Sequence, residues 1–244
     1  KPFGGAEELS WSPDGKTLAY SSRKKTGMEY SLSTNTDIYL YDLASGQTRN
    51  ITEGMGGYDT HPRFSPDGKR ISWISMERDG YEADLKRLFV QDLKTGQKTF
   101  LTDGFEYDVD ELQWAANSQS LFFLSTKHAE AQLWEIALKG RKIRQITTGM
   151  HDYTSLDVQG GKILAGRQSY IEPTDLYLVD VKTGAAKQLT AENKSTLDGL
   201  APISVEKRWV KTTDGGNMLV WVVLPPNFDK TKKYPALLFC QGGP

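Results

Sequence analysis

Apolar and polar residues alternate over short stretches along most of this chain. The clearest stretch, residues 37–43, reads Asp-Ile-Tyr-Leu-Tyr-Asp-Leu, and similar stretches occupy 88–93, 133–136 and 176–180. Alternation with a period of two is typical of β-strands that bury one face. The pattern therefore predicts an all-β protein built from short strands.

These strands belong to a larger repeat with a period of roughly 45–50 residues. Each unit closes with an apolar residue followed by a threonine, and the four closing residues are Thr52, Thr102, Thr147 and Thr190. Two units carry the sequence Ser-Pro-Asp-Gly, at 12–15 and 65–68, and the fourth has a turn at 159–161 instead. Ser-Pro-Asp-Gly suits a tight turn because proline presets φ, aspartate can bond its own backbone and glycine tolerates positive φ.

Four short antiparallel strands in each unit describe the blade of a β-propeller. A β-sandwich is the alternative, but it does not explain why the same order of strands and turns recurs in register. We predict about four blades, the later ones of a seven-bladed ring, over residues 1–200. On this interpretation the chain begins part-way round the ring.

Composition narrows the function. The chain has 244 residues, with 30 basic and 31 acidic side chains and a net charge of −1. This balance argues against a general nucleic-acid or anionic-membrane binder. No apolar run is long enough to span a bilayer, and Cys240 is the one cysteine, so no intrachain disulfide can form. Neither metal-ligand spacing nor a phosphate-binding glycine loop occurs, and we expect no metal and no cofactor.

Blade geometry separates the connections into two groups. The first-to-second and third-to-fourth turns lie on one face of a propeller, and these turns are short here. The second-to-third loops and the blade connections lie on the other face. We expect long, irregular loops there, at 22–36, 76–86, 126–132 and 169–174. Because binding usually resides in such loops on a rigid scaffold, this is the candidate functional face.

The loop at 76–84 contains four carboxylates in nine residues. One interpretation is a solvated hairpin tip with an Asp-Gly turn. The other is a receptor for a cationic group, such as the α-amine of a peptide, with Glu77 and Glu82 as its partners. Three blade connections also carry an aspartate: Asp59, Asp108 and Asp152. These aspartates either cap backbone N–H groups of the neighbouring blade or form a ring of carboxylates at the channel mouth.

The chain lacks the elements of a serine-hydrolase site. Its three histidines, His61, His128 and His151, follow no hydrolase-like element, and no Gly-x-Ser-x-Gly sequence occurs. We therefore expect no catalytic residue in this segment. Residues 234–240 have the pattern of a short buried strand, in which Cys240 would be a small core residue, and Gln-Gly-Gly-Pro follows. A strand that runs into such a turn is where α/β-hydrolases place oxyanion-binding N–H groups, which makes Gln241 and Gly242 the candidate oxyanion-hole region.

The order of these features resembles the prolyl oligopeptidase family of serine peptidases, which join a β-propeller to a C-terminal α/β-hydrolase domain. The most specific part is the junction, which comprises 209–215, 220–226, 232–235 and 241–244. The resemblance implies that residues 201–244 are the first, truncated strands of the hydrolase domain. It is strongest with the acylaminoacyl-peptidase and dipeptidyl-peptidase branch. Where this chain has Gln241, family members commonly carry histidine or tyrosine, so the oxyanion geometry would differ.

The resemblance implies a portion of a serine exopeptidase that cleaves short peptides near their N-terminus by acyl transfer. The propeller would control access, and the Ser-Asp-His triad would lie elsewhere in the polypeptide. The expected partners are a peptide substrate, the rest of the polypeptide and a second copy in a homodimer. The compartment stays open between the cytoplasm and the exported bacterial periplasm, with the periplasm favoured.

Two alternatives remain. One is a non-catalytic propeller that binds other proteins, although such a module has no reason to carry the segment 205–244. The other is a glycan lyase or glycan hydrolase propeller, for which the loop carboxylates are the sole support.

Overall fold

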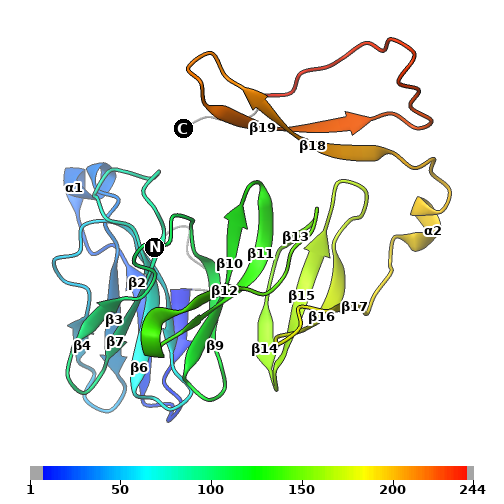
Figure 1. Cartoon of the computed structure of the whole chain (residues 1–244). Coiled ribbons are helices and arrows are strands. Elements are labelled where there is room, and N and C mark those ends of the chain that lie inside the picture. Colours follow the sequence, from blue (N-terminus) through cyan, green and yellow to red (C-terminus); the bar gives the residue numbers. More distant parts are fainter. Residues whose placement is uncertain (1–7, 241–244) are drawn as a thin grey trace. The chain divides into compact units, whose positions relative to one another are not determined.

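The computed structural model describes residues 8–240. The chain separates between Glu192 and Asn193 into two compact units. Figure 1 labels their elements. This division falls near the predicted boundary at residues 200 and 201, but the assignment of the second unit to a hydrolase domain stays a prediction.

The first unit contains four antiparallel sheets in chain order, which we call blades 1 to 4 (Figure 1). Blade 1 comprises β1 (Leu9–Trp11), β2 (Thr17–Ser22), β3 (Asp37–Asp42) and β4 (Thr48–Asn50). Blade 2 comprises β5 (Asp59–Phe64), β6 (Arg70–Ser75), β7 (Arg87–Asp92) and β8 (Lys98–Phe100). Each strand of these two blades pairs with the next strand in the sequence.

Blades 3 and 4 continue the series. Blade 3 comprises β9 (Asp110–Trp114), β10 (Ser120–Lys127), β11 (Glu130–Ala137) and β12 (Ile143–Gln145). In blade 4, β13 (Asp152–Tyr153) and β14 (Asp157–Gln159) both pair with β15 (Lys162–Gln168), which is followed by β16 (Asp175–Asp180) and β17 (Ala186–Gln188). A short 3-10 helix, η2 (Lys139–Arg141), precedes β12. The predicted repeat of four-stranded units is confirmed in blades 1 to 3, and blade 4 departs from it because two short strands, β13 and β14, pair with β15 in place of a single first strand.

The closing threonines have one structural role in all four blades. Each threonine Oγ1 accepts a hydrogen bond, at 2.9–3.0 Å, from a backbone N–H of the strand that precedes the last strand of its blade. These strands are β3, β7, β11 and β16. The four donors are Ile38, Leu88, Leu133 and Leu176. This bond ties the end of each blade back to its own centre, which explains why threonine recurs there.

Apolar side chains fill the spaces between successive blades. The cluster between blades 1 and 2 includes Ile38 and Trp73, and the cluster between blades 2 and 3 includes Leu88 and Phe123. These four side chains are completely buried. A third cluster, around Ile163, joins blades 3 and 4. Each blade therefore buries its apolar residues against a neighbour, as expected for a repeat whose units cannot form a core alone.

One predicted loop is absent. The segment 126–132 is not an irregular loop: β10 and β11 pair up to Lys127 and Glu130, leaving a two-residue turn. His128 and Ala129 make this turn with φ values of 53° and 58°. Such hairpin turns normally carry Asn-Gly or Gly-Gly, so the turn has no signal in the sequence.

The second unit contains a short helix α2 (Lys194–Leu197) and a hairpin of β18 (Ser204–Lys211) and β19 (Asn217–Leu224). The eight residue pairs of the hairpin run in register from Ser204↔Leu224 to Lys211↔Asn217. No helix among residues 8–240 is long and apolar enough to cross a membrane.

The strand predicted at 234–240 is not formed. These residues have no regular secondary structure, Leu237, Leu238 and Phe239 are largely exposed, and Cys240 is exposed rather than buried. A strand requires a neighbour for its backbone hydrogen bonds, and no described strand pairs with this segment. The prediction of a buried strand and a buried cysteine is therefore wrong for this structure.

Candidate functional site

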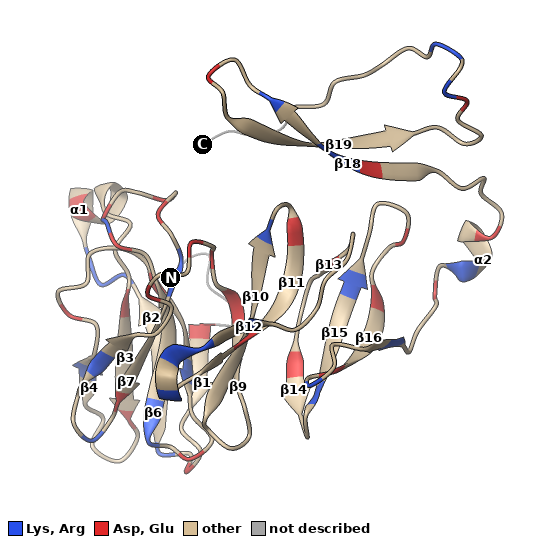
Figure 2. Ribbon diagram, viewed as in Figure 1, with Lys and Arg blue, Asp and Glu red and all other residues tan. Residues whose placement is uncertain are grey.

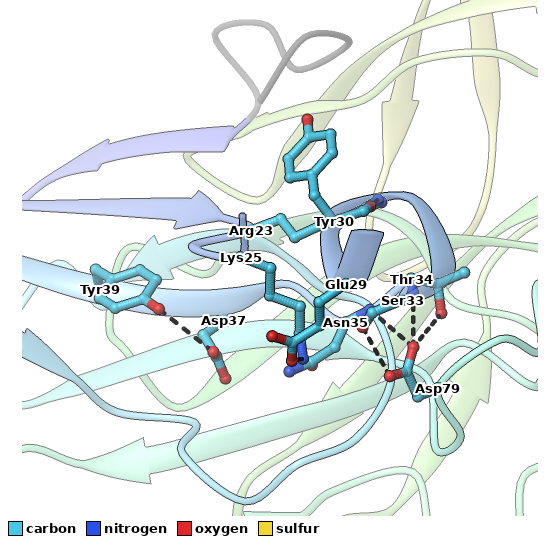
Figure 3. Close-up of polar contacts among 10 residues, drawn as sticks. All are labelled: Arg23, Lys25, Glu29, Tyr30, Ser33, Thr34, Asn35, Asp37, Tyr39 and Asp79. Atoms are coloured by element: carbon cyan, nitrogen blue, oxygen red, sulfur yellow. Dashed lines mark hydrogen bonds and ion pairs between the residues drawn. The ribbon is translucent and has the colours of Figure 1, made fainter. Parts of the chain in front are cut away.

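The loop of blade 1 on the candidate face contains a helix that the sequence pattern did not predict. Helix α1 (Gly27–Leu32) occupies the middle of segment 22–36. Lys25 forms an ion pair with Glu29 at 2.7 Å, and the Arg23 guanidinium donates to the backbone oxygen of Tyr30 and lies over its ring. Figure 3 shows these residues beside the segment 33–35 that follows the helix.

Asp79, from the loop of blade 2, fastens the two loops together. Its carboxylate accepts hydrogen bonds from Ser33 Oγ at 2.7 Å, from Thr34 N at 2.6 Å and from Asn35 N at 3.2 Å (Figure 3). The hydrogen bond from Ser33, followed by those from the backbone, lowers the pKa of Asp79. The carboxylate-rich segment is exposed over residues 77–83 and turns at Asp79-Gly80, as the hairpin-tip interpretation expected. It is also attached to the neighbouring blade through Asp79.

A second carboxylate of the loop is also committed to structure. Arg78 pairs with Asp84, whose pKa this hydrogen bond lowers, and the Arg78 guanidinium lies 4.0 Å from the centre of the Tyr81 ring. The loop also lies against Gly57, where a Cβ atom would be 2.6 Å from the backbone oxygen of Met76. Glycine is required at that position by the close approach of the two backbones.

The two predicted anchor residues have different partners. Glu77 is mostly exposed, and its carboxylate lies 3.3 Å from Arg87, a residue of β7. Glu82 accepts a hydrogen bond from the Tyr58 hydroxyl at 3.0 Å. Burial and then this carboxylate raise the pKa of Tyr58. The other two predicted site residues, Gln241 and Gly242, lie outside the described residues.

A pocket of about 360 Å³ lies between blades 2 and 3. Its lining includes Met76 and Lys86, the two ends of the blade 2 loop at 76–86. Its apolar lining comes from Ile74 and Met76, and its polar lining includes Tyr58, His61, Lys86, Asp110 and Glu111. Lys86 pairs with Asp110 at 2.6 Å, whereas Glu111 is exposed and has no ion-pair partner among residues 8–240. The pocket therefore offers an apolar wall and an unneutralised carboxylate, which suits a ligand with an apolar body and a cationic group.

His61 and Glu111 share an unusual backbone. Their φ values are 56° and 43°, and each lies where the pairing of its strand shifts register, in β5 and in β9. Bulges of this kind re-aim a side chain and are common near functional sites. Sequence reasoning missed both residues because positive φ is usually signalled by glycine, which neither position carries.

The comparisons with known proteins agree with this architecture. The family model described as "TolB beta propeller domain" (PD40) matches residues 9–230. The chain therefore belongs to the TolB β-propeller family.

Curated relatives of this propeller include two proteins named dipeptidyl-peptidase 5. The one from Porphyromonas gingivalis is 65% identical over 244 residues, which are 100% of this chain and 36% of the relative. The one from Porphyromonas endodontalis is 57% identical over 244 residues, covering 100% of this chain and 35% of the relative. The propeller chain thus spans about a third of the length of these relatives. The predicted resemblance to the dipeptidyl-peptidase branch is confirmed.

A solved structure supports the fold. The acylaminoacyl peptidase of Pyrococcus horikoshii matches with a TM-score of 0.70 at 18% identity, over 89% of this chain and 32% of that one. Together with the family match, this likeness confirms the predicted propeller fold.

The aspartates of the propeller's blade connections do not form one set. Asp108 accepts a hydrogen bond from Lys86 N and Asp152 accepts one from Ala131 N, both at 2.8 Å, so the capping interpretation is confirmed for these two. Asp59 is different, because it is completely buried and caps no backbone group. Elsewhere in the first unit, acidic and basic residues are interspersed along the strands and turns (Figure 2).

Proposed function

We propose that this chain is the propeller portion of a serine exopeptidase of the dipeptidyl-peptidase type. The observation that carries the proposal is the 65% identity, over the whole chain, with a protein named dipeptidyl-peptidase 5. The reaction would be acyl transfer from the peptide to a serine, with the Ser-Asp-His triad elsewhere in the same polypeptide. Gln241 and Gly242 are the proposed oxyanion-hole region of that site.

The propeller would select short peptides by their free N-terminus. An ammonium group held in a partly buried site needs a carboxylate partner. Glu82 is the stronger candidate of the two predicted anchors because its observed partner, the Tyr58 hydroxyl, is neutral and lines the pocket. Glu77 is the weaker candidate, because Arg87 already neutralises it.

The first test is the intact mass of the denatured protein, combined with an assay on dipeptidyl-aminomethylcoumarin substrates. The proposal expects a mass well above 27.3 kDa and turnover that a fluorophosphonate abolishes. A longer polypeptide without such turnover would contradict it and would favour the alternative of a binding propeller. The native mass of the same sample tests the expected homodimer.

A further inference from the structure

Asp59 is a buried acid at the connection from blade 1 to blade 2. It is the first residue of β5, and its exposed fraction is 0%. Neither carboxylate oxygen has a hydrogen-bond partner among residues 8–240. Burying a polar group without a hydrogen bond is costly, and burying it as an ion is far more so. A carboxyl group in this place therefore requires an explanation other than packing.

The next blade connection shows that the fold does not need an acid here. The N–H of Asp59 donates to the oxygen of Thr36 at 3.0 Å, and the N–H of Val109 donates to the oxygen of Lys86 at the same distance. The two residues thus hold equivalent positions, and Val109 is also completely buried. At the equivalent position of the next blade connection, the buried side chain is therefore apolar.

The surroundings of Asp59 disfavour its ionised form. Burial is the main effect, and together with the negative charge of Asp37 on β3 it raises the pKa of Asp59 to about 7. Ser75 and Trp73 on β6, and Thr52 at the end of blade 1, direct polar groups toward the carboxyl and oppose this rise in part, although none of these contacts meets the geometry of a hydrogen bond. The basic residue of β7, Arg87, donates to the backbone oxygen of Ser75 and pairs with Glu77.

The backbone of Asp59 is the anchor of the blade 1 loop. Its carbonyl oxygen accepts hydrogen bonds from Ser21 Oγ at 2.7 Å and from Thr36 Oγ1 at 2.9 Å. Ser21 directly precedes the segment 22–36 and Thr36 is its last residue, and residues 33–35 of this segment hydrogen-bond to Asp79. The residues on either side of Asp59, Tyr58 and Thr60, line the pocket between blades 2 and 3.

We propose that Asp59 is a proton-controlled latch for the loops of the candidate face. As a neutral acid it stays buried, and its backbone holds both ends of segment 22–36 against blade 2. When it ionises, the carboxylate must reach water, and this movement breaks the backbone contacts with Ser21 and Thr36. The loop pair and the pocket rim then loosen together. The latch depends on the fold alone and stands whether or not the protein is a peptidase.

The direction of the pH effect follows from proton linkage. The pKa of Asp59 is about 7 in the folded state, against an ordinary value of 3.8 for an aspartic acid. Between these values the unfolded or opened state binds fewer protons than the closed state, so rising pH favours opening. The closed loop is fully stabilised below about pH 4, and this stabilisation is lost as the pH rises through about 7.

The latch can be tested by hydrogen–deuterium exchange of the full chain between pH 5.5 and 8.5, corrected for intrinsic exchange rates. We expect opening of segment 33–38 to increase by up to about tenfold per pH unit above the pKa of Asp59. In Asp59→Asn and Asp59→Val this pH dependence should vanish, the valine reproducing the equivalent Val109. Asp108→Asn, at the next connection, is the matched control and should keep the wild-type profile.

Two results would overturn the proposal. One is an Asp59→Asn protein whose loop opens with the same pH dependence as wild type. The other is a carboxyl ¹³C resonance of Asp59 that titrates near its ordinary value of about 4. The resonance is measured on the wild-type protein, so it decides the question even if both variants fold poorly.

Discussion

The two glutamates of the blade 2 loop differ in what they can still bind. Glu77 lies 3.3 Å from Arg87, so a second cation would have to compete for it. Glu82 accepts from a neutral tyrosine hydroxyl and forms no ion pair with another of the described residues 8–240. At the scale of single residues, the partner of each carboxylate therefore decides its availability more than its place in the sequence does.

With the proposed dipeptidyl-peptidase function, this difference predicts how variants of the two glutamates bind substrate. Glu82→Gln in the full protein should raise KM for dipeptidyl substrates by roughly tenfold or more, because a hydrogen bond to a charged group contributes about 1.5–3 kcal/mol. Glu77→Gln should change KM less. The measurement is steady-state kinetics, and an N-acetylated substrate, which lacks the ammonium group, is the control. Equal losses on both substrates would show that Glu82 does not bind the amine.

At the scale of elements, connections are decided by contacts that cross from one strand or blade to another. Segment 126–132 collapses into a two-residue turn because β10 and β11 pair along their full length. The loops of blades 1 and 2 take their form from the contacts of Asp79 with residues 33–35. Each of these two connections leads to a prediction about stability.

The hairpin turn carries strain that glycine would relieve. Ala129 has a φ of 58°, a conformation that costs an L-residue about 1–2 kcal/mol. Ala129→Gly should therefore raise the free energy of unfolding, by about 1 kcal/mol after the entropic cost of glycine is subtracted. Urea denaturation measures the change. Ala137→Gly, within β11, is the control and should lower the free energy of unfolding.

The contact between Asp79 and the blade 1 loop predicts that removing it lowers the stability of that loop but not of the whole first unit. Asp79→Ala removes the acceptor for Ser33, Thr34 and Asn35, so the amides of 33–35 should exchange faster, with a loss of about 1–3 kcal/mol. Hydrogen exchange resolved by residue is the measurement. Asp103→Ala, at an exposed position of the next blade connection, should leave these amides unchanged. If the amides of 33–35 exchanged at the wild-type rate in Asp79→Ala, the segment around helix α1 would be stable without the contact to Asp79.

At the scale of the molecule, the stability of the first unit resides between its blades. Phe123 belongs to the cluster shared by blades 2 and 3 and is completely buried. The large aromatic and aliphatic side chains of these clusters come from different repeats, so no blade is stable without its neighbour.

Truncation of a side chain buried between two blades should strongly destabilise the first unit. Phe123→Ala should lower the free energy of unfolding of the first unit by about 3–5 kcal/mol. Leu189→Ala, at an exposed position in the same unit, should change it by less than about 0.5 kcal/mol. Chemical denaturation followed by tryptophan fluorescence measures both. Similar effects of the two substitutions would contradict the interface model.

The sequence by itself determined the repeat, the four-stranded units of blades 1 to 3 and the propeller class, because these rest on local patterns. Alternation with a period of two, the Ser-Pro-Asp-Gly turns and the closing threonines act over a few residues, and the structure reproduces each of them. The same reasoning correctly located Glu77 and Glu82 in a loop of the candidate face.

Tertiary structure alone decided the chemistry of that face. The pocket between blades 2 and 3, the backbone of His61 and Glu111, and the unpartnered burial of Asp59 all depend on residues from different strands. Asp59, Asp108 and Asp152 look alike in the sequence, yet two cap a backbone N–H and one is buried without a partner. Burial and charge at a site are sums over neighbours that only packing of the blades brings together, and so no local pattern could reveal them.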